Sequence, residues 1–252
     1  MGGAAIERAE WSKKVRAMAE ALYDHGAPAY WVKWGLSLDP MHREFIEKFL
    51  GRLSVPSDIL DAACGAGRFD GILSEAGHRV LGIDQSSGVL AKAQEHFPQE
   101  HFPTLNYVKI GLQEMDFQTA FDGIICMDAM EHICPEDYPG ILHGFQEALK
   151  PGGVLYLTAD RAEEPDFDLE AYYERAKAAG LPVVFGEVAD DAAFERALEH
   201  PEVSGEQADI AVYHYYPPLE KVREWINQAG LAIEEEGMGS GWCHFLTRNK
   251  KA

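Results

Sequence analysis

Short apolar runs alternate with amphipathic stretches from residue 59 onward. Five runs predict buried strands, at 59–63, 79–83, 105–110, 121–127 and 153–159. Amphipathic stretches at helical spacing predict the helices between them, at about 68–77, 86–96 and 136–149. Strands that alternate with helices through short connections indicate a parallel, doubly wound sheet with right-handed crossovers.

Both ends of the chain add to this pattern. In the first 50 residues, apolar side chains recur at helical spacing from Trp11 to Leu22, and a second helix is expected from about Asp39 to Leu50. Aromatic residues cluster around Pro28 in the connection between them. Near the other end, Pro217-Pro218 begins a helix that reaches Ala229, and runs at 231–236 and 242–247 predict an antiparallel pair. We therefore expect an α/β fold with a mostly parallel seven-stranded sheet and N-terminal helices.

The alternation breaks at residues 160–212. Two helices are expected there, at about 167–179 and 190–199, and we interpret the segment as an insertion after the fifth strand. The predicted organisation is a helical cap at 1–54, an α/β core at 55–159, the insertion at 160–212, and a helix with two strands at 213–252 that completes the sheet.

Charge narrows the classes of partner. The 252-residue chain has 42 acidic and 22 basic side chains and a formal net charge of −20. Such a chain repels phosphate backbones and anionic membrane surfaces, so nucleic-acid and membrane partners are not expected. Residues 160–210 hold 15 of the acidic and 4 of the basic side chains. This segment is either a solvated surface or an acidic lid that favours a neutral or cationic substrate.

The cysteines and the N-terminal residues indicate in which cellular compartment the protein is expected. The four cysteines, Cys64, Cys126, Cys134 and Cys243, are too scattered for a disulfide framework or a zinc site. No signal-peptide pattern and no run of 18 apolar residues is visible. We therefore expect a cytoplasmic protein without a metal site, as a monomer or a homodimer.

The most informative stretch is a glycine-containing turn after the first core strand. Small residues from Ala62 to Gly67 allow a tight turn and a close approach of the backbone to a ligand. A dinucleotide-binding turn has Gly or Ala three residues beyond its second glycine, where this chain has Asp70. Asp61 suits a ligand that carries an ammonium group. Asp84 ends the next strand, where a carboxylate can accept both hydroxyls of a ribose.

Four motifs in this order resemble the class I S-adenosylmethionine-dependent methyltransferases. They are Asp-Ala-Ala-Cys-Gly-Ala-Gly at 61–67, Gly-Ile-Asp at 82–84, Phe-Asp-Gly-Ile-Ile-Cys-Met at 121–127, and Leu-Lys-Pro-Gly-Gly at 149–153. The resemblance covers about residues 55–160. It implies a Rossmann-like methyltransferase fold and S-adenosylmethionine as cofactor, with S-adenosylhomocysteine as product.

The resemblance also implies a set of cofactor-binding residues. Many members have Gly-Asp where this chain has Gly111-Leu112, which makes Gln113 the candidate for the adenine amino group. The full predicted set is Tyr23, Tyr30, Asp61, Ala63, Gly65, Ala66, Gly67, Asp84, Gln85, Gln113, Glu114, Met127 and Asp128.

The acceptor site is predicted from residues near the methyl group. His132 follows the fourth strand and is one candidate general base; alternatively, it holds the loop after the strand. The run from Asp128 to His132 also resembles the Glu-x-x-Glu-His pattern of ubiquinone-biosynthesis O-methyltransferases, in which a divalent metal can bind. Here the first acid is Asp128 and no catechol-type partner motif is visible, so no metal is expected. His214 is the second candidate base.

Aromatic residues supply the remaining acceptor candidates. Tyr215, Tyr216 and Trp34 are the predicted substrate contacts, with packing as the alternative for each. Packing is the first interpretation of Trp31, Trp242 and His244, and Cys126 is expected to be an inert core thiol.

The expected function is methyl transfer from S-adenosylmethionine to an oxygen or nitrogen of a small-molecule acceptor by in-line displacement. Two alternatives stay open: a protein or RNA methyltransferase, and a homologue that binds the cofactor without catalysis. The negative charge argues against RNA, and no Asn-Pro-Pro-Tyr-type motif follows the fourth strand. The acidic insertion favours neutral or cationic acceptors over polyanions.

Overall fold

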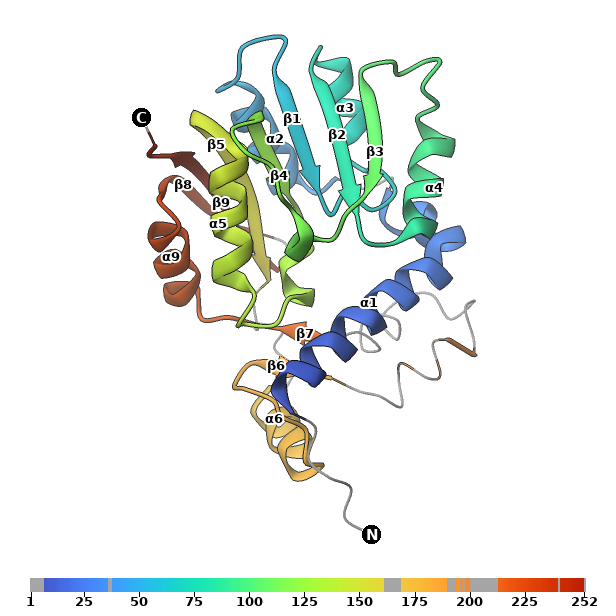
Figure 1. Cartoon of the computed structure of the whole chain (residues 1–252), viewed down its shortest axis with the longest axis vertical. Coiled ribbons are helices and arrows are strands. Elements are labelled where there is room, and N and C mark those ends of the chain that lie inside the picture. The colour runs from blue at the N-terminus through green and yellow to red at the C-terminus, as the bar shows by residue number, and fades with distance from the viewer. Residues whose placement is uncertain are drawn as a thin grey trace.

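A computed structural model describes residues 7–35, 38–160, 169–189, 194, 196, 198–199, 213–239 and 241–251. Its centre is a seven-stranded sheet in the order β3-β2-β1-β4-β5-β9-β8 (Figure 1). The strands are β1 (Asp58–Ala62), β2 (Arg79–Asp84), β3 (Leu105–Lys109), β4 (Phe121–Cys126), β5 (Leu149–Asp160), β8 (Leu231–Gly239) and β9 (Trp242–Asn249). Strands β1 to β5 are parallel, and β9 runs antiparallel to both β5 and β8. The predicted fold class is confirmed.

Helices cover both faces of this sheet, which is why its central strands are apolar throughout. On one face, α2 (Pro40–Leu50) and α3 (Asp70–Glu75) bury Phe45, Phe49 and Leu73 against β1 and β4. On the other, α5 (Tyr138–Ala148) and α9 (Leu219–Gln228) contribute Phe145 and Trp225. Helix α4 (Ser87–His96) connects β2 to β3. Burial on both faces explains the continuous apolar runs in the sequence.

The first helix is longer than its apolar spacing predicts. Helix α1 (Arg8–Tyr30) continues through Pro28 and is followed by a π-helical turn, Trp31–Gly35. Proline removes one backbone hydrogen bond, to the carbonyl of Asp24, and normally ends a helix. Here Asp24 is held from outside the helix, because its Oδ1 accepts the Ser86 hydroxyl and the Gly88 N–H at 2.7 Å each. Contacts with the start of α4 therefore outweigh the local signal, and the expected break in this region is wrong.

The Lys-Pro-Gly-Gly stretch after α5 also differs from expectation. The sequence predicts a helix that ends at about residue 149 and a strand that starts at 153, but β5 begins directly after α5, at Leu149. Phe121 pairs with Leu149 and Gly123 pairs with Val154, so the residues between bulge out of the sheet. A positive φ of 73° at Gly152 permits this bulge.

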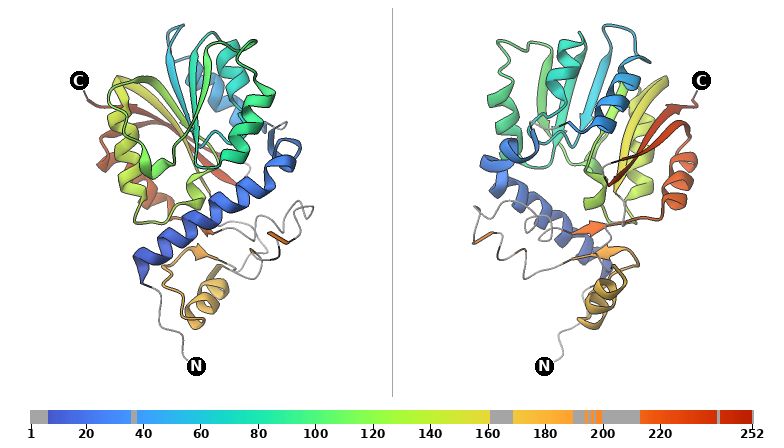
Figure 2. Two further views of the ribbon diagram at one scale, coloured as in Figure 1. Left: turned by 45° about the vertical axis from the view of Figure 1, so that its right-hand side comes forward. Right: turned by 180° about the vertical axis from the view of Figure 1, so that it is seen from behind.

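The segment after β5 is only partly described. Helix α6 (Leu169–Ala178) matches the first expected insertion helix, while the second, at 190–199, lies mostly outside the described residues. A small antiparallel pair, β6 (Glu187–Val188) and β7 (His214–Tyr215), is too short for a periodic signal. Figure 2 shows α1 passing between the sheet and α6. The division into four segments stays a prediction. None of the helices in the described part has the length and apolar character needed to cross a bilayer.

Candidate active site

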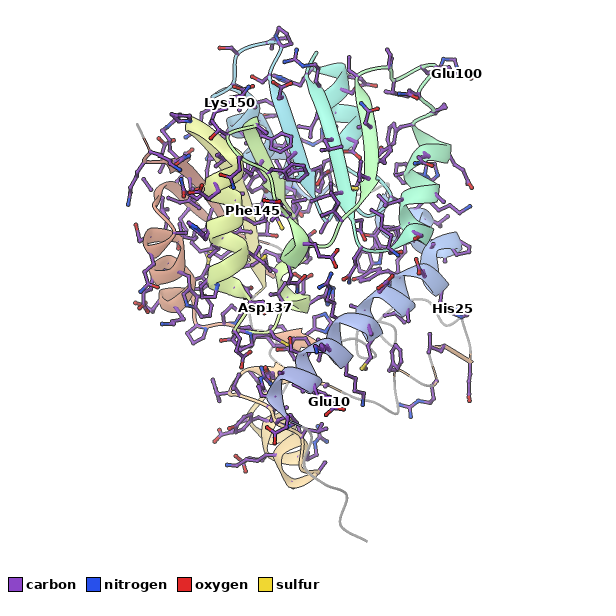
Figure 3. The ribbon with its side chains drawn as sticks, viewed as in Figure 1. Glu10, His25, Glu100, Asp137, Phe145 and Lys150 are labelled. Atoms are coloured by element: carbon purple, nitrogen blue, oxygen red, sulfur yellow. The ribbon has the colours of Figure 1, made fainter. Side chains whose placement is uncertain are left out.

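The carboxyl ends of β1, β2 and β4 meet at one edge of the sheet, and α1 crosses that edge (Figure 1). The glycine turn follows β1, Asp84 ends β2, and the 3₁₀ turn η3 (Met130–His132) follows β4. Doubly wound sheets bind ligands at this edge. Figure 3 places Asp137 at the same end as α1, with Lys150 at the opposite end of the sheet.

A cavity with about 750 Å³ of empty space, its open mouth included, lies between this edge and α1. That volume is in the range of small-molecule sites. Nine predicted site residues line it: Tyr23, Tyr30, Ala63, Gly65, Asp84, Gln85, Gln113, Asp128 and His132. Lining residues that the sequence analysis missed include Ser12, Arg16, Ala19, Cys134 and Asp137. Three of these belong to α1, whose position over the sheet edge has no signal in the sequence.

The glycine turn lets other side chains approach its backbone closely. Gly65 has a φ of 55°, and a Cβ there would lie 2.7 Å from the Tyr30 hydroxyl oxygen. Ala63 adopts a φ of 62° in the same turn, an unusual conformation for a residue with a side chain. Gly67 faces the other way, because its Cβ would meet the Asp70 carboxylate and the Tyr107 hydroxyl at 2.9 Å. Gly65 therefore borders the cavity, whereas Gly67 allows packing behind the turn.

Asp84 lies between the turn and α4 with both carboxylate oxygens directed by backbone groups. Its Oδ2 accepts the Gly65 N–H at 3.0 Å and its Oδ1 accepts the Ser86 N–H at 2.8 Å. Burial raises the pKa of Asp84 to about 6, although both N–H groups favour the ionised form. With Gln85 beside it in the cavity wall, Asp84 provides acceptors for ligand hydroxyls.

Asp61 does not line the cavity. It is 1% exposed, and within the described part of the chain its Oδ2 has no hydrogen-bond partner. Burial, followed by the neighbouring charge of Asp70, raises its pKa well above the ordinary value. Burial likewise raises the pKa of Asp70 to about 6. This pair of carboxyl groups lies behind the glycine turn.

On the far side of Gln85, the short helix η2 (Leu112–Glu114) contributes Gln113 to the cavity wall. Its side-chain N–H donates to Asp137 Oδ2 at 3.3 Å. Glu114 points toward α1, where it forms an ion pair with Arg16 at 2.5 Å, and it is not among the described lining residues; its cofactor contact stays a prediction.

Asp128 is the most strongly paired acidic residue of the cavity. It has a φ of 51°, its Oδ1 lies 3.0 Å from His42 Nε2, and its Oδ2 accepts from Arg68. Burial opposes ionisation, but the His42 hydrogen bond and the Arg68 charge lower the pKa of Asp128 to about 2. Met127, one residue earlier, is 5% exposed and packs in the core instead. The sequence analysis did not identify His42, on α2, as the partner of Asp128.

His132 is held at both ring nitrogens. Its Nδ1 lies 3.1 Å from the Tyr213 carbonyl oxygen, and its Nε2 lies 2.7 Å from the Tyr23 hydroxyl. A carbonyl oxygen only accepts, so Nδ1 carries the proton in this contact. For neutral His132, Nε2 is then the basic nitrogen and accepts the Tyr23 O–H. The arrangement is that of a base oriented by a second group.

The remaining predicted acceptor residues lie outside the cavity wall. The His214 ring lies 4.9 Å from that of His132 and stacks on Tyr216. Tyr215 is buried edge-to-face against Tyr138. Trp34 lies under the Lys33 ammonium at 4.3 Å. None of these four residues is among the described residues that line the cavity. Ala66, a predicted cofactor-binding residue, is also absent from them, because it is fully buried in the glycine turn.

Trp31, His244 and Cys126 pack against neighbouring side chains, as the sequence analysis expects. Trp31 stacks on His96 with ring centroids 3.9 Å apart. His244 is buried, bonds the Tyr156 hydroxyl at 2.8 Å, and lies beside His42. Cys126 is fully buried, and burial raises the pKa of its thiol.

Comparisons with known proteins agree with this geometry. A family model described as a methyltransferase domain matches residues 59–153. The ubiquinone biosynthesis O-methyltransferase of Albidiferax ferrireducens is 32% identical over 107 residues, which are 41% of this chain and 42% of that protein. Its counterpart in Methylococcus capsulatus is 31% identical over 127 residues, 48% of this chain and 50% of that protein. The match spans about half the length of these curated relatives.

Solved structures share the fold. A methyltransferase from Methanosarcina mazei superposes with a TM-score of 0.65 at 16% identity, covering 86% of this chain and all of that one. The 1,6-didemethyltoxoflavin-N1-methyltransferase of Burkholderia thailandensis, solved with S-adenosylhomocysteine, gives 0.64 at 15% identity, covering 100% of this chain and 94% of that one.

Fold, cavity and family match together define a class of protein. Residues 59–153 match a methyltransferase domain, and the strand order around them is that of the class I S-adenosylmethionine-dependent methyltransferases. Within that class, the curated relatives named above are O-methyltransferases of ubiquinone biosynthesis.

Proposed function

We propose that this chain transfers the methyl group of S-adenosylmethionine to a hydroxyl oxygen of a neutral small molecule, with His132 as the general base. The observation that carries the proposal is the pairing of His132 Nε2 with the Tyr23 hydroxyl at 2.7 Å in the cavity wall, with Nδ1 fixed by a carbonyl. A neutral amine needs no such base, whereas a hydroxyl nucleophile is activated by one.

The residues of the cavity fit the cofactor in a defined orientation. Gly65 lets Tyr30 pack directly against the turn, since a Cβ there would lie 2.7 Å from the Tyr30 hydroxyl oxygen, and both residues line the cavity. Asp84 accepts the two ribose hydroxyls, and Gln85 and Gln113 lie where the adenine would bind. These assignments are part of the proposal; in this orientation the sulfonium end would lie toward Asp128 and His132.

When bound, the cofactor supplies a methyl group already activated by a positively charged sulfur. The chain's residues align the acceptor and take up a proton. The new bond joins the acceptor oxygen to the methyl carbon as the carbon–sulfur bond breaks. The acceptor proton passes to the Tyr23 oxygen while the Tyr23 proton passes to His132 Nε2. Alignment by α1 and the sheet edge supplies the entropic part of the rate enhancement.

The named relatives support oxygen as the acceptor atom, since the curated ones are O-methyltransferases. The Burkholderia thailandensis structure is an N-methyltransferase, so the fold alone does not separate the two chemistries. The acidic balance of residues 160–210 supports a neutral or cationic acceptor over a polyanion.

The test replaces His132 by Gln and measures S-adenosylhomocysteine formation with catechol, phenol, benzylamine and benzoate as acceptors. We expect turnover of the hydroxyl acceptors to fall by about 10²–10⁴-fold, while S-adenosylhomocysteine affinity changes less than about twofold. The matched surface control is His143→Gln, because His143 is exposed on α5. Full turnover in His132→Gln, or a clear preference for benzoate, would refute the proposal.

A second variant separates the two candidate histidines. His214 lies beside His132 but not among the described lining residues, so His214→Gln should retain most turnover. If His214→Gln is inactive and His132→Gln active, the base is His214.

A further inference from the structure

A continuous set of contacts joins the start of α1 to His132. It begins at Arg8, whose guanidinium offers five N–H donors. Two reach the carboxylate of Glu136, at 2.7 and 2.9 Å, two reach that of Glu187, and one reaches the Pro182 carbonyl. Every donor of Arg8 therefore has an acceptor, and one side chain links α1, the turn after η3 and the insertion.

The two carboxylates that Arg8 binds differ in burial. The Glu187 side chain is fully buried, while that of Glu136 is 49% exposed. Besides Arg8, Glu187 accepts the Val184 N–H and the Tyr213 hydroxyl, each at 2.8 Å. The carboxylate oxygens of both and Cys134 Sγ lie within 4.8 Å of one another, and the Arg8 guanidinium bonds both carboxylates. The buried Glu187 carboxylate is held in place by these donors. The ion pair of Arg8 with the half-exposed Glu136 contributes little to stability.

Tyr213 transmits this fixation to the active site. It is fully buried, its hydroxyl donates to Glu187, and its ring packs edge-to-face on Trp11 at 6.5 Å. With the ring held by Trp11 and the hydroxyl by Glu187, the backbone of Tyr213 is fixed at the start of β7. Its carbonyl is the group that accepts the His132 Nδ1–H at 3.1 Å.

We propose that Glu187 and Tyr213 are positioning residues for methyl transfer: through the Tyr213 carbonyl, the buried carboxylate holds His132 in the tautomer with a basic Nε2. The inference rests on the proposed function of His132. It assigns Glu187 of the insertion, together with Tyr213 directly after the insertion, the task of orienting the base. Specificity by charge would then belong to other parts of the segment.

The geometry explains why an insertion after the fifth strand is needed at all. His132 lies in η3, a single turn with three residues, which is too short to fix an imidazole by itself. Glu187 lies in β6 and Tyr213 directly precedes β7, the strand that pairs with β6 and contacts η3. The second group that orients a general base is thus supplied from outside the sheet.

The test uses Glu187→Gln and Tyr213→Phe in the full chain, with Glu136→Gln as matched control. Glu136→Gln removes a carboxylate from the same Arg8 but leaves Glu187 in place. Nitrogen-15 NMR of the histidine rings reports which nitrogen of His132 carries the proton, with His132→Gln identifying the signal. Calorimetry with S-adenosylhomocysteine reports folding and cofactor binding, and catechol turnover reports kcat and KM.

For Glu187→Gln and Tyr213→Phe we expect the His132 proton to shift from Nδ1 toward Nε2. We also expect kcat to fall about 10–100-fold with little change in S-adenosylhomocysteine affinity. Glu136→Gln should resemble the parent protein in all three measurements. Tyr213→Phe keeps the ring and tests the proposal if Glu187→Gln does not fold.

Two failures are distinguishable. If the His132 signals are unchanged in folded Glu187→Gln and Tyr213→Phe, the positioning role is wrong, whatever the activity. If His132→Gln is fully active, the proposed function is wrong, although the tautomer shift can still be seen because the NMR measurement needs no acceptor.

Discussion

Lowering the pH is expected to weaken binding of S-adenosylhomocysteine through one residue, Asp84. Burial raises its pKa to about 6, the Ser86 and Gly65 N–H groups oppose this, and the nearby Asp24 and His132 charges act in opposite directions. Only the ionised carboxylate accepts both ribose hydroxyls. Affinity is therefore complete above the pKa and is lost as the pH falls through about 6.

The size of the effect follows from a single titrating group. Well below the pKa, each unit of pH lowers the affinity about tenfold, which corresponds to about 1.4 kcal/mol. At pH 5 roughly one Asp84 in eleven is ionised, so we expect about tenfold weaker binding than at neutral pH. Asp84→Asn removes the charge from two hydrogen bonds worth about 1.5–3 kcal/mol each and should weaken binding at least tenfold at neutral pH.

The assay is calorimetric titration with S-adenosylhomocysteine from about pH 7.5 to about pH 5 at constant ionic strength. The parent protein should show the loss of affinity described above, and Asp84→Asn should bind weakly with little dependence on pH. If Asp84→Asn keeps the full pH dependence, the reasoning is refuted. The titrating group would then belong to the Asp61 and Asp70 pair, whose pKa values are also raised by burial.

Two further predictions concern stability and the glycine turn. Gly65→Ala should weaken S-adenosylhomocysteine binding at least about tenfold, because its Cβ would lie 2.7 Å from the Tyr30 oxygen; Ala63→Gly should instead raise the free energy of unfolding in urea by about 1 kcal/mol by relieving a φ of 62°. If Gly65→Ala and Ala63→Gly changed S-adenosylhomocysteine affinity and the free energy of unfolding by the same amounts, this account of the turn would be contradicted. Arg8→Met should lower the free energy of unfolding by about 3 kcal/mol, since it leaves buried Glu187 without its cation; a loss below about 1 kcal/mol would show that this carboxylate is solvated.

The sheet could be predicted because each of its central strands is a continuous apolar run with helices on both sides. Asp84 could be predicted too, because it ends such a run and thereby reaches the carboxyl edge. Met127 and Asp128 show the limit of this reasoning. They are neighbours after β4, yet only Asp128 is among the described lining residues of the cavity; its φ of 51° turns the chain away from the strand direction directly after Met127.

Contacts between distant segments could not be predicted. Arg8 and Glu187 are 179 positions apart, and His132 and Tyr213 are 81 apart. No periodicity in either segment marks these pairs, because a single ion pair or carbonyl contact requires only one residue on each side. The continuation of α1 through Pro28 could not be predicted for the same reason, because it depends on tertiary contacts of Asp24 with the start of α4.

The strand order has a consequence for how such a protein can diversify. From β1 outward to β3 the edge holds Asp84 and Gln85, while from β4 outward to β5 it leads to His132 and the insertion. The two halves are joined by the pairing of β1 with β4, but the loops that face the cavity come from separate parts of the chain, so mutations in the loops of one half can accumulate while those of the other are preserved. Exchange of the segment between β5 and α9 would thus be the natural route to a new acceptor, with cofactor recognition inherited unchanged.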